Sequence, residues 1–251
     1  MTAGEETFHV VARNSPEHAR NAIHTDAGAR AAGYERALVA GVTSYAYCCH
    51  VAIARFGPPW VTNGTAEVRL RAPVFDGDEL LLPCRERADG GIDVTVTAAR
   101  STEPLVEMQA WPGPPPDDTV GGTGRGAPSP LETLTPVEIR LEGEYGAEYG
   151  LRAGDPDPGL PPGLVHPAVF VALANQVVQS QLARGAWVHT RSRVRHYAAG
   201  WEGADAVVTG ALVLRELRRS GERATASLEV STGGTLLATL LHEAIVDLSA
   251  R

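Results

Sequence analysis

Apolar and polar residues follow the same order in the two halves of the chain, first an apolar helix and then a series of strands. Residues 42–56 form an apolar run of helical length that ends at Gly57-Pro58-Pro59, and residues 168–183 are its counterpart. After each helix, stretches rich in Val, Leu and Thr predict β-strands. These strands are residues 65–72, 79–87, 92–99 and 105–111 in the first half, and residues 190–196, 206–217, 224–231 and 236–247 in the second.

The first half has two further predicted elements ahead of its long helix. Residues 8–12 alternate as a strand, and residues 25–32 are typical of a short helix. Each long helix is apolar nearly all round and therefore needs cover on every side. The economical fold is of the α+β class, with an antiparallel sheet wrapped around one buried central helix in each half.

Similar residues recur in the two halves at a spacing of 126 residues. A period this long indicates a duplicated domain rather than a solenoid. Residues 112–130 are rich in Pro, Gly, Thr and Asp and predict a linker. The expected organisation is an N-terminal domain at 1–111, the linker, and a C-terminal domain at 131–251. The recurring residues are Leu38-Val39 with Leu164-Val165, Val68 with Val194, Phe75 with Trp201, and Gly77 with Gly203.

Charge and composition narrow the range of partners. The chain has 251 residues, a formal net charge of -8 and a sequence pI near 5.5, and its longest basic run is Arg218-Arg219. These values argue against a nucleic-acid or anionic-membrane partner. The N-terminal residues are acidic and no apolar run approaches the length of a membrane span, so we expect a cytoplasmic protein.

The chain contains no lysine, since all 22 cationic side chains are arginine. Schiff-base chemistry, covalent attachment of pyridoxal phosphate and a P-loop NTPase all need that amine and are excluded. The cysteines Cys48, Cys49 and Cys84 have no spacing typical of a disulfide framework or a metal site, so neither a metal nor another cofactor is expected. A nucleophilic Cys48 or Cys49 is one alternative, and a buried helical thiol is the other.

The segment before the first long helix contains the first candidate for acid–base chemistry. His24 has a side chain whose unperturbed pKa lies near neutrality, and Asn21 stands three residues earlier. The motif Asn21-Ala22-Ile23-His24 is followed by Gly33-Tyr34, by residues 38–42, by Gly64-Thr65-Ala66-Glu67-Val68-Arg69 and by Pro73-Val74-Phe75-Asp76-Gly77-Asp78. In this order the first half resembles the MaoC-like enoyl-thioester hydratases and dehydratases, which have the hotdog fold.

The resemblance implies a double hotdog, in which the two sheets pair edge to edge and an acyl tunnel lies at the interface between the halves. It places the thioester near the N-terminus of the first central helix, at Ala40, Gly41 and Val42. The unsatisfied N–H groups there can receive the carbonyl oxygen as it gains charge, and glycine allows a ligand to approach the main chain.

The resemblance also implies that His24 is the acid–base group and that Asn21 orients its ring or holds substrate. The chain departs from the family's Asp-x-Asn-Pro-hydrophobic-His signature, because Ala19 stands at the Asp position and Ala22 at the Pro position. A substitute carboxylate is expected from Glu17, with Asp26 or a residue of the second half as alternatives. Without one, His24 alone would suit an elimination, an isomerisation or a ring closure better than plain hydration.

The second half lacks the Asn-x-x-His motif, so its equivalent catalytic site is expected to be lost. It contains His166 at the entrance of its central helix, Asn175 within that helix, and His189 after it. These positions distantly resemble double-hotdog acyl-CoA thioesterases, although Asn175 stands where an Asp is often found and an amide is a poor general base. A structural role for His166 at the helix start is the alternative.

Two further patterns have more than one interpretation. Arg191, Arg193 and Arg195 alternate along a predicted strand and either contact a phosphate of the substrate or form a solvated outer face. The Asp-Gly-Asp sequence at residues 76–78 is typical of a hairpin turn, and no further ligands follow at calcium-site spacing.

The sequence therefore predicts a MaoC-like hydratase, dehydratase or related proton-transfer lyase of fatty acid or polyketide metabolism. The substrate would be an acyl chain held on CoA or on an acyl carrier protein. The alternatives are an acyl-CoA thioesterase that uses His166 and Asn175, and a noncatalytic acyl-thioester-binding subunit. The sequence leaves a homodimer open.

Overall fold

The strands form a single sheet that runs through both halves of the molecule. The computed structural model describes residues 7–116 and 129–248, and in these ranges 12 strands join in the order β1-β3-β5-β6-β2-β9-β12-β11-β10-β7, with β4 paired to β5 and β8 to β10. All pairings are antiparallel. The strands are β1 (Phe8–Val11), β2 (Thr65–Leu70), β3 (Glu79–Leu82), β4 (Cys84–Glu86), β5 (Ile92–Ala98), β6 (Ser101–Trp111), β7 (Glu132–Thr133), β8 (Val137–Arg140), β9 (Val188–His196), β10 (Asp205–Arg218), β11 (Gly221–Thr232) and β12 (Thr235–Leu248).

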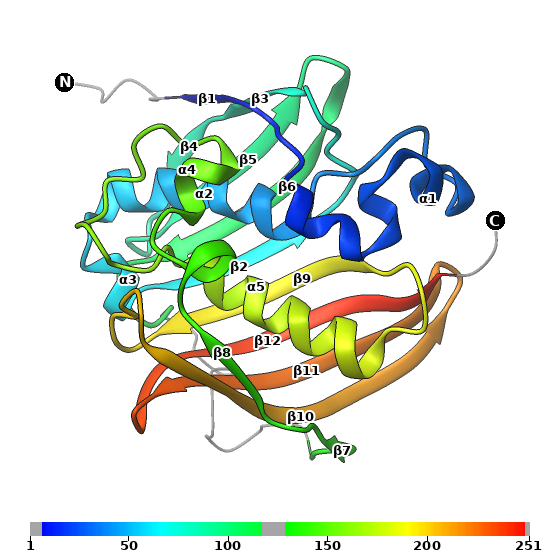
Figure 1. Cartoon of the computed structure of the whole chain (residues 1–251). Helices are drawn as coiled ribbons and strands as arrows, with labels where there is room; N and C mark the ends of the chain where they lie inside the picture. Colours follow the sequence, from blue (N-terminus) through cyan, green and yellow to red (C-terminus); the bar gives the residue numbers. More distant parts are fainter. Residues whose placement is uncertain (1–6, 117–128, 249–251) are drawn as a thin grey trace.

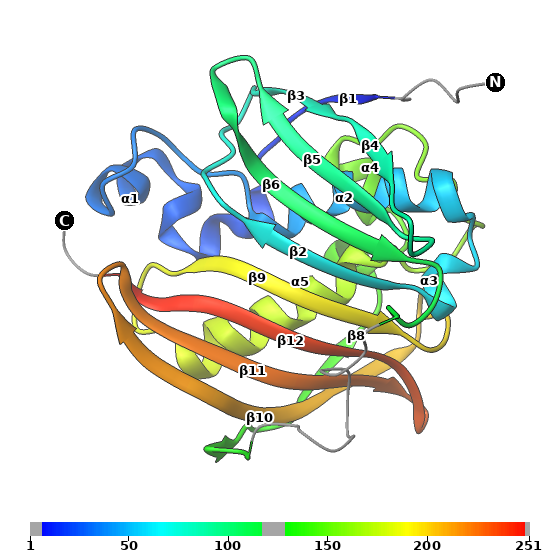
Figure 2. The same cartoon turned by 180° about the vertical axis from the view of Figure 1, so that it is seen from behind.

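Two long helices lie on the inner face of this curved sheet, α2 (Gly41–Phe56) from the first half and α5 (Ala168–Val177) from the second (Figure 1). They contact each other. Figure 2 shows the other face of the sheet, with β2 and β9 side by side at its middle. The shorter helices are η1 (Pro16–Arg20), η2 (Ala22–His24), α1 (Asp26–Ala31), α3 (Trp60–Asn63), η3 (Gly143–Tyr145), α4 (Tyr149–Ala153) and the π-helical turn η4 (Val178–Leu182).

The 126-residue repeat predicted from the sequence is visible in the backbone. Glu67 of β2 pairs with Arg193 of β9, which is its own counterpart at that spacing. The isolated bridge between Leu38 and Phe75 recurs as a bridge between Leu164 and Trp201. The β2–β9 pair is therefore the seam between two equivalent units, and the predicted edge-to-edge pairing of the two sheets is confirmed.

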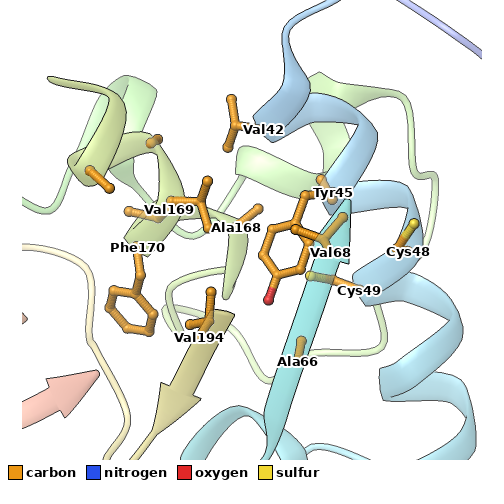
Figure 3. Packing of buried hydrophobic residues seen from close by; sticks show 14 of the residues in the cluster. Val42, Tyr45, Cys48, Cys49, Ala66, Val68, Ala168, Val169, Phe170 and Val194 are labelled. Carbon is orange, nitrogen blue, oxygen red and sulfur yellow. The ribbon is translucent and has the colours of Figure 1, made fainter. Parts of the chain in front are cut away.

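The core is continuous across that seam (Figure 3). Val68 on β2 and Val194 on β9 are fully buried, as is Phe170 on α5. Cys48 and Cys49 lie in the same core on α2, and burial raises the pKa of Cys48 to about 12. A thiol of that pKa holds almost no thiolate at neutral pH, so the structure favours the buried-thiol interpretation over the nucleophile.

The predicted elements agree with the structure except at some ends and in short segments. The strand predicted at 79–87 is two strands, because Pro83 cannot donate a hydrogen bond to the neighbouring strand. The helix predicted at 168–183 ends in the π-helical turn. Among the described residues no helix combines the length and the apolar character needed to span a membrane. The predicted linker at 112–130 and the domain limits around it lie largely outside the described residues.

Candidate functional site

A cavity of about 400 Å³ lies between the two halves, next to the start of α2. The first half contributes residues 17–24, the first turn of α2 and the segment 70–74. The second half contributes one side of α5, residues 144–149 and the start of β9. The cavity thus occupies the interface where an acyl tunnel was expected.

The segment that carries the candidate acid–base groups is held by backbone and side-chain contacts. Asn14 donates from its side-chain amide to the carbonyl oxygen of His24 at 2.8 Å, and its own N–H donates to Asp76 at 2.7 Å. The N–H of Leu38 donates to the carbonyl of Ile23 at 3.0 Å. These bonds fix two short 3-10 helices, which periodicity does not predict because they are too short to show a pattern.

His24 lies at the cavity wall and is half-buried. Its Nδ1 is 2.8 Å from the carbonyl oxygen of Leu38. Because a carbonyl only accepts, Nδ1 carries the proton and Nε2 has the free lone pair. Burial lowers the pKa of His24 to about 4, partly offset by the bond to Leu38. The ring is therefore neutral at pH 7 and can accept a proton at Nε2.

His18 is a second imidazole in the same cavity, and sequence reasoning missed it. Its ring centroid is 5.7 Å from that of His24, and its Nε2 is 3.3 Å from the hydroxyl of Thr43 on α2. Burial lowers the pKa of His18 to about 4, and Glu144 opposes the shift. The signal was available, because His18 immediately precedes Ala19, the position at which the resembled family carries its Asp.

Asn21 does not orient the His24 ring, contrary to expectation. Its amide nitrogen donates to the carbonyl of Trp187 at 2.8 Å, and its amide oxygen accepts from the N–H of Trp187 at 3.4 Å. Asn21 is buried, and it lines the cavity beside these bonds. It therefore joins the first half to the second, and the main chain of Leu38 holds the imidazole instead.

The carboxylates proposed to replace the missing Asp have other partners. Glu17 lines the cavity, and its carboxylate lies 3.7 Å from the guanidinium of Arg152. Asp26 is exposed and accepts from the N–H of Ala37 at 2.9 Å. Within the described residues no carboxylate hydrogen-bonds the His24 ring. The same residues contain no group of three or more His, Cys, Asp or Glu side chains that could hold a metal ion.

The start of α2 faces the cavity at Ala40 and Gly41, whereas Val42 is fully buried in the core. A Cβ at Gly41 would lie 2.8 Å from Leu70 and 2.9 Å from Nδ1 of His189, so only glycine fits between them. Ala40 is the N-cap residue of α2, and its methyl side chain cannot accept a hydrogen bond from the first N–H groups of the helix. The first N–H groups of α2 are consequently available to an acceptor in the cavity.

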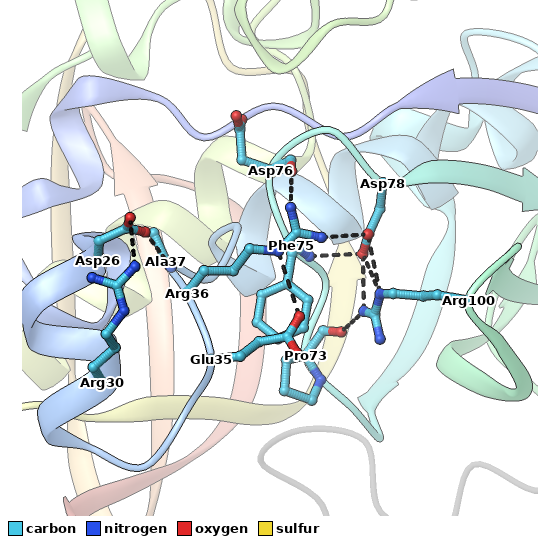
Figure 4. Close-up of polar contacts among 10 residues, drawn as sticks. All are labelled: Asp26, Arg30, Glu35, Arg36, Ala37, Pro73, Phe75, Asp76, Asp78 and Arg100. Atoms are coloured by element: carbon cyan, nitrogen blue, oxygen red, sulfur yellow. Dashed lines mark hydrogen bonds and ion pairs between the residues drawn. The ribbon is translucent and has the colours of Figure 1, made fainter.

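An ion-pair cluster supports the loop that forms one wall of the cavity (Figure 4). The buried carboxylate of Asp78 accepts from the N–H of Phe75 at 2.9 Å, from Arg100 at 2.9 Å and from Arg36 at 3.2 Å. Arg100 also donates to the carbonyl of Pro73. Pro73 lines the cavity, so the cluster positions this wall, and the Asp-Gly-Asp sequence is a structural turn.

The thioesterase candidates of the second half lie apart. Asn175 lines the cavity, and its side-chain oxygen is buried without a partner. His166 is completely buried outside the cavity lining and accepts the N–H of Ala168 at 3.2 Å. Burial lowers the pKa of His166 to about 4. These contacts favour the structural interpretation of His166.

The three arginines of β9 lie on the outer face of the sheet, away from the helices. Arg191 and Arg193 donate to the carboxylate of Glu67 on β2, at 2.6 Å and 3.0 Å. The contacts of these two side chains favour the outer-face interpretation over a substrate phosphate site.

Comparison with solved structures gives the fold its name. A MaoC domain protein from Chloroflexus aurantiacus J-10-fl, provisionally named a dehydratase, superposes with a TM-score of 0.65 at 13% identity, over 98% of this chain and 95% of that one. A conserved Mycobacterium tuberculosis protein described as a double hotdog has a TM-score of 0.61 at 12% identity, over 97% and 96% of the two chains. The chain has the double hotdog fold.

A protein from Lactobacillus plantarum, provisionally named an oleoyl thioesterase, gives a TM-score of 0.56 at 9% identity, over 98% of this chain and 99% of that one. No protein family model matches the sequence, and no curated protein matches it. The double hotdog expected from the sequence is thus confirmed, and similar structures include both dehydratase and thioesterase names.

Proposed function

We propose that this protein is a MaoC-like hydratase, dehydratase or related proton-transfer lyase that acts on an acyl thioester of CoA or an acyl carrier protein. The observation that carries the proposal is His24. Its Nδ1 is held by the carbonyl of Leu38, and its neutral ring lines the cavity that also contains the start of α2. The proposed base, His24, and the helix N–H groups proposed to stabilise negative charge on the thioester oxygen therefore line one cavity.

A single imidazole can carry out the proton transfers of a dehydration. Nε2 of His24 takes the α-proton, and the electron pair moves onto the thioester oxygen, which the N–H of Gly41 stabilises. As the enolate collapses, the β-hydroxyl leaves and the imidazolium returns the proton to it as water. Hydration is the reverse sequence. This path needs no carboxylate at the position of Ala19. His18 is a second polar group close to His24.

The lining fits an acyl chain attached to a polar carrier. Leu38, Leu70 and Ile245 are apolar, while other parts of the lining are charged and polar, among them Arg71, which pairs with Glu107, and Arg223, which pairs with Glu243. Such a division suits a thioester with an apolar end and an anionic or polar end. We assign the protein to fatty acid or polyketide metabolism on this basis, as a cytoplasmic enzyme.

Thioester hydrolysis is the second candidate, because the side-chain oxygen of Asn175 is buried in the cavity lining without a partner. That oxygen could accept a hydrogen bond from an attacking water. A noncatalytic acyl-binding subunit is the third candidate, since the carboxylate of the family signature is missing.

The test incubates the purified protein with crotonyl-CoA and with a longer trans-2-enoyl-CoA, and follows enoyl absorbance and free thiol together. We expect loss of the enoyl signal without thiol release. His24→Ala should lower turnover by roughly 100-fold or more, as removal of a general acid–base group does, whereas His166→Ala should retain turnover. Thiol release that depends on Asn175 would establish the thioesterase instead. Saturable binding without any product would establish the binding subunit.

A further inference from the structure

Three buried side chains form a hydrogen-bonded chain behind the cavity wall. Nε2 of His189 is 2.8 Å from the hydroxyl of Ser192, and that hydroxyl is 2.8 Å from Nδ1 of His242. The two rings stack with their centroids 4.4 Å apart. Ser192 and His242 are paired residues of β9 and β12, and a bulge between Glu243 and Ala244 brings His189 to the same inner face.

The outer end of this chain lies at the start of α2. His189 lines the cavity together with Gly41, and only 5% of the residue is exposed. Its Nδ1 is buried without a hydrogen-bond partner and is turned towards Gly41, since a Cβ built there would lie 2.9 Å from it. A buried polar atom without a partner is costly, and this one lies at the cavity wall, where a ligand or water can pair with it. The second half of the molecule thus supplies a polar atom to the helix start of the first half.

The hydrogen-bonded chain also determines which ring nitrogen of His189 carries the proton. The Ser192 hydroxyl has one proton, so it donates to one imidazole and accepts from the other. If it accepted from His189, the N–H of His242 would be at Nε2, which is buried without a partner. Either arrangement leaves one ring N–H without a partner in the protein, at Nε2 of His242 or at Nδ1 of His189. His242 is fully buried outside the cavity lining, whereas His189 lines the cavity, where its N–H can meet a ligand or water. The favoured arrangement runs from His242 Nδ1–H to Ser192 and from the Ser192 hydroxyl to His189 Nε2, which leaves an N–H at His189 Nδ1.

We propose that the Nδ1–H of His189 donates to the thioester carbonyl oxygen beside the N–H of Gly41, and that Ser192 and His242 are positioning residues that hold it in the donating tautomer. The proposal rests on the proposed function, since it names the second donor of that same site. His189 acts as a neutral donor, not as an acid. Burial lowers the pKa of His189 to about 3, and an interaction with the backbone of Arg191 partly opposes the shift, so the ring is neutral at pH 7.

The first experiment measures the tautomer of His189 in the ligand-free protein and needs no substrate. Nitrogen chemical shifts of labelled histidine, assigned with His189→Leu, should show a proton on Nδ1. Ser192→Ala should remove the preference. A proton on Nε2 in the wild-type protein would overturn the proposal and leave the proposed function untouched.

The second experiment uses 4-(dimethylamino)cinnamoyl-CoA, whose absorbance shifts to the red when its carbonyl is polarised. We expect a red shift on binding, a smaller shift in His189→Leu and Ser192→Ala, and partial recovery in His189→Gln, which retains an N–H. The matched control is His196→Leu, which removes another buried histidine of β9 that lies outside the cavity lining and should leave the shift unchanged. Turnover of enoyl-CoA should fall roughly 100-fold in His189→Leu, as for loss of one oxyanion donor.

The outcomes separate the two claims. An unchanged red shift in a folded His189→Leu protein, with enoyl turnover retained, would overturn the role of His189 alone. Failure of the wild-type protein to bind the probe at any concentration would overturn both the role of His189 and the proposed function.

Discussion

The two central helices begin differently, although the backbone around them repeats. At α2, Gly41 leaves the first N–H groups facing a cavity. At α5, the ring of His166 accepts the N–H of Ala168, and a Cβ at Gly150 would lie 2.9 Å from that ring and 3.1 Å from Pro158. The segment after α4 thus closes the second helix start. Both halves of the duplicated chain have the same fold, but only the central helix of the first half has an open start.

The closed start has a polar core of its own. Asp155 is fully buried, and its carboxylate is 2.8 Å from Nδ1 of His50 on α2. His50 in turn stacks on Phe8 of β1, with ring centroids 3.8 Å apart. The space that would correspond to the cavity is therefore occupied by side chains of the protein itself. An open helix start therefore needs a small residue at the helix N-terminus and no segment that covers it.

The largest expected effect comes from closing the open start. Gly41→Ala places a methyl group within 3 Å of Leu70 and His189, so one of them must move and the approach to the first N–H is blocked. We expect enoyl-CoA turnover to fall roughly 100-fold. The matched change at the closed start, Ala168→Gly, should leave turnover unchanged and cost roughly 1–2 kcal/mol of stability, since it lowers helix propensity and removes a buried methyl group. Full turnover in Gly41→Ala would show that the α2 start does not contact the thioester.

Asp78 tests whether the wall of the open site needs its ion-pair cluster. Asp78→Ala leaves the N–H of Phe75 without its acceptor and two guanidinium groups without their carboxylate. Because both arginines are partly exposed, water replaces part of the loss, and we expect about 2 kcal/mol of destabilisation by urea unfolding. The control in the second half is Asp205→Ala, whose pair with Arg140 is exposed and screened by solvent, so its loss should lower stability much less. Equal losses would show that the cluster has no special role.

Asn21 tests the contact that joins the two halves beside the cavity. Asn21→Ala removes both bonds to the main chain of Trp187, which should destabilise the protein by roughly 1–3 kcal/mol. Turnover of the folded protein should stay within about tenfold of wild type, because Leu38 still holds His24. A large loss of turnover at unchanged stability would restore Asn21 as the residue that orients His24.

Near neutral pH the smallest expected effect is on the pH dependence of stability, which grows only as the pH falls below 6.5. The pKa of His166 is lowered to about 4 in the folded protein, from 6.5. Between these values the unfolded chain binds more protons, so stability is complete above pH 6.5 and falls as the pH decreases towards 4. His166→Gln should reduce this slope by up to about 1.4 kcal/mol per pH unit. Replacing the exposed His9 is the control, and an unchanged slope in His166→Gln would contradict the expected burial.

Much of the fold could be predicted because it depends on local patterns and on a long repeat. The apolar runs gave both central helices, and the counterparts Leu38 and Leu164 occupy the same bridge in each half. The short elements η1, η2, α3 and α4 were not predicted, because segments this short show no period. The π-helical end of α5 was missed for a related reason, since its sequence continues the helical pattern.

The candidate site was only partly predictable. His24, Ala40 and Gly41 were named from the sequence and line the cavity, as do Asn21, Glu17 and Asn175. His18 and the donor position of His189 were not recognised. His18 was overlooked although it immediately precedes Ala19, whereas the donor position of His189 depends on neighbours distant in sequence.

The duplicated architecture follows from the amino-acid sequence, since the apolar helices and the alternating strands are local patterns of residue order that recur in both halves. The sequence also determined the absence of any amine chemistry by lysine. Three features depend on the tertiary structure. The main chain of Leu38 rather than Asn21 holds His24, and one helix start is open while the other is closed. In addition, His189 of the second half lies against Gly41 of the first. Hydrogen bonds and desolvation act over a few ångströms in space, and the fold brings together residues that sequence distance keeps apart.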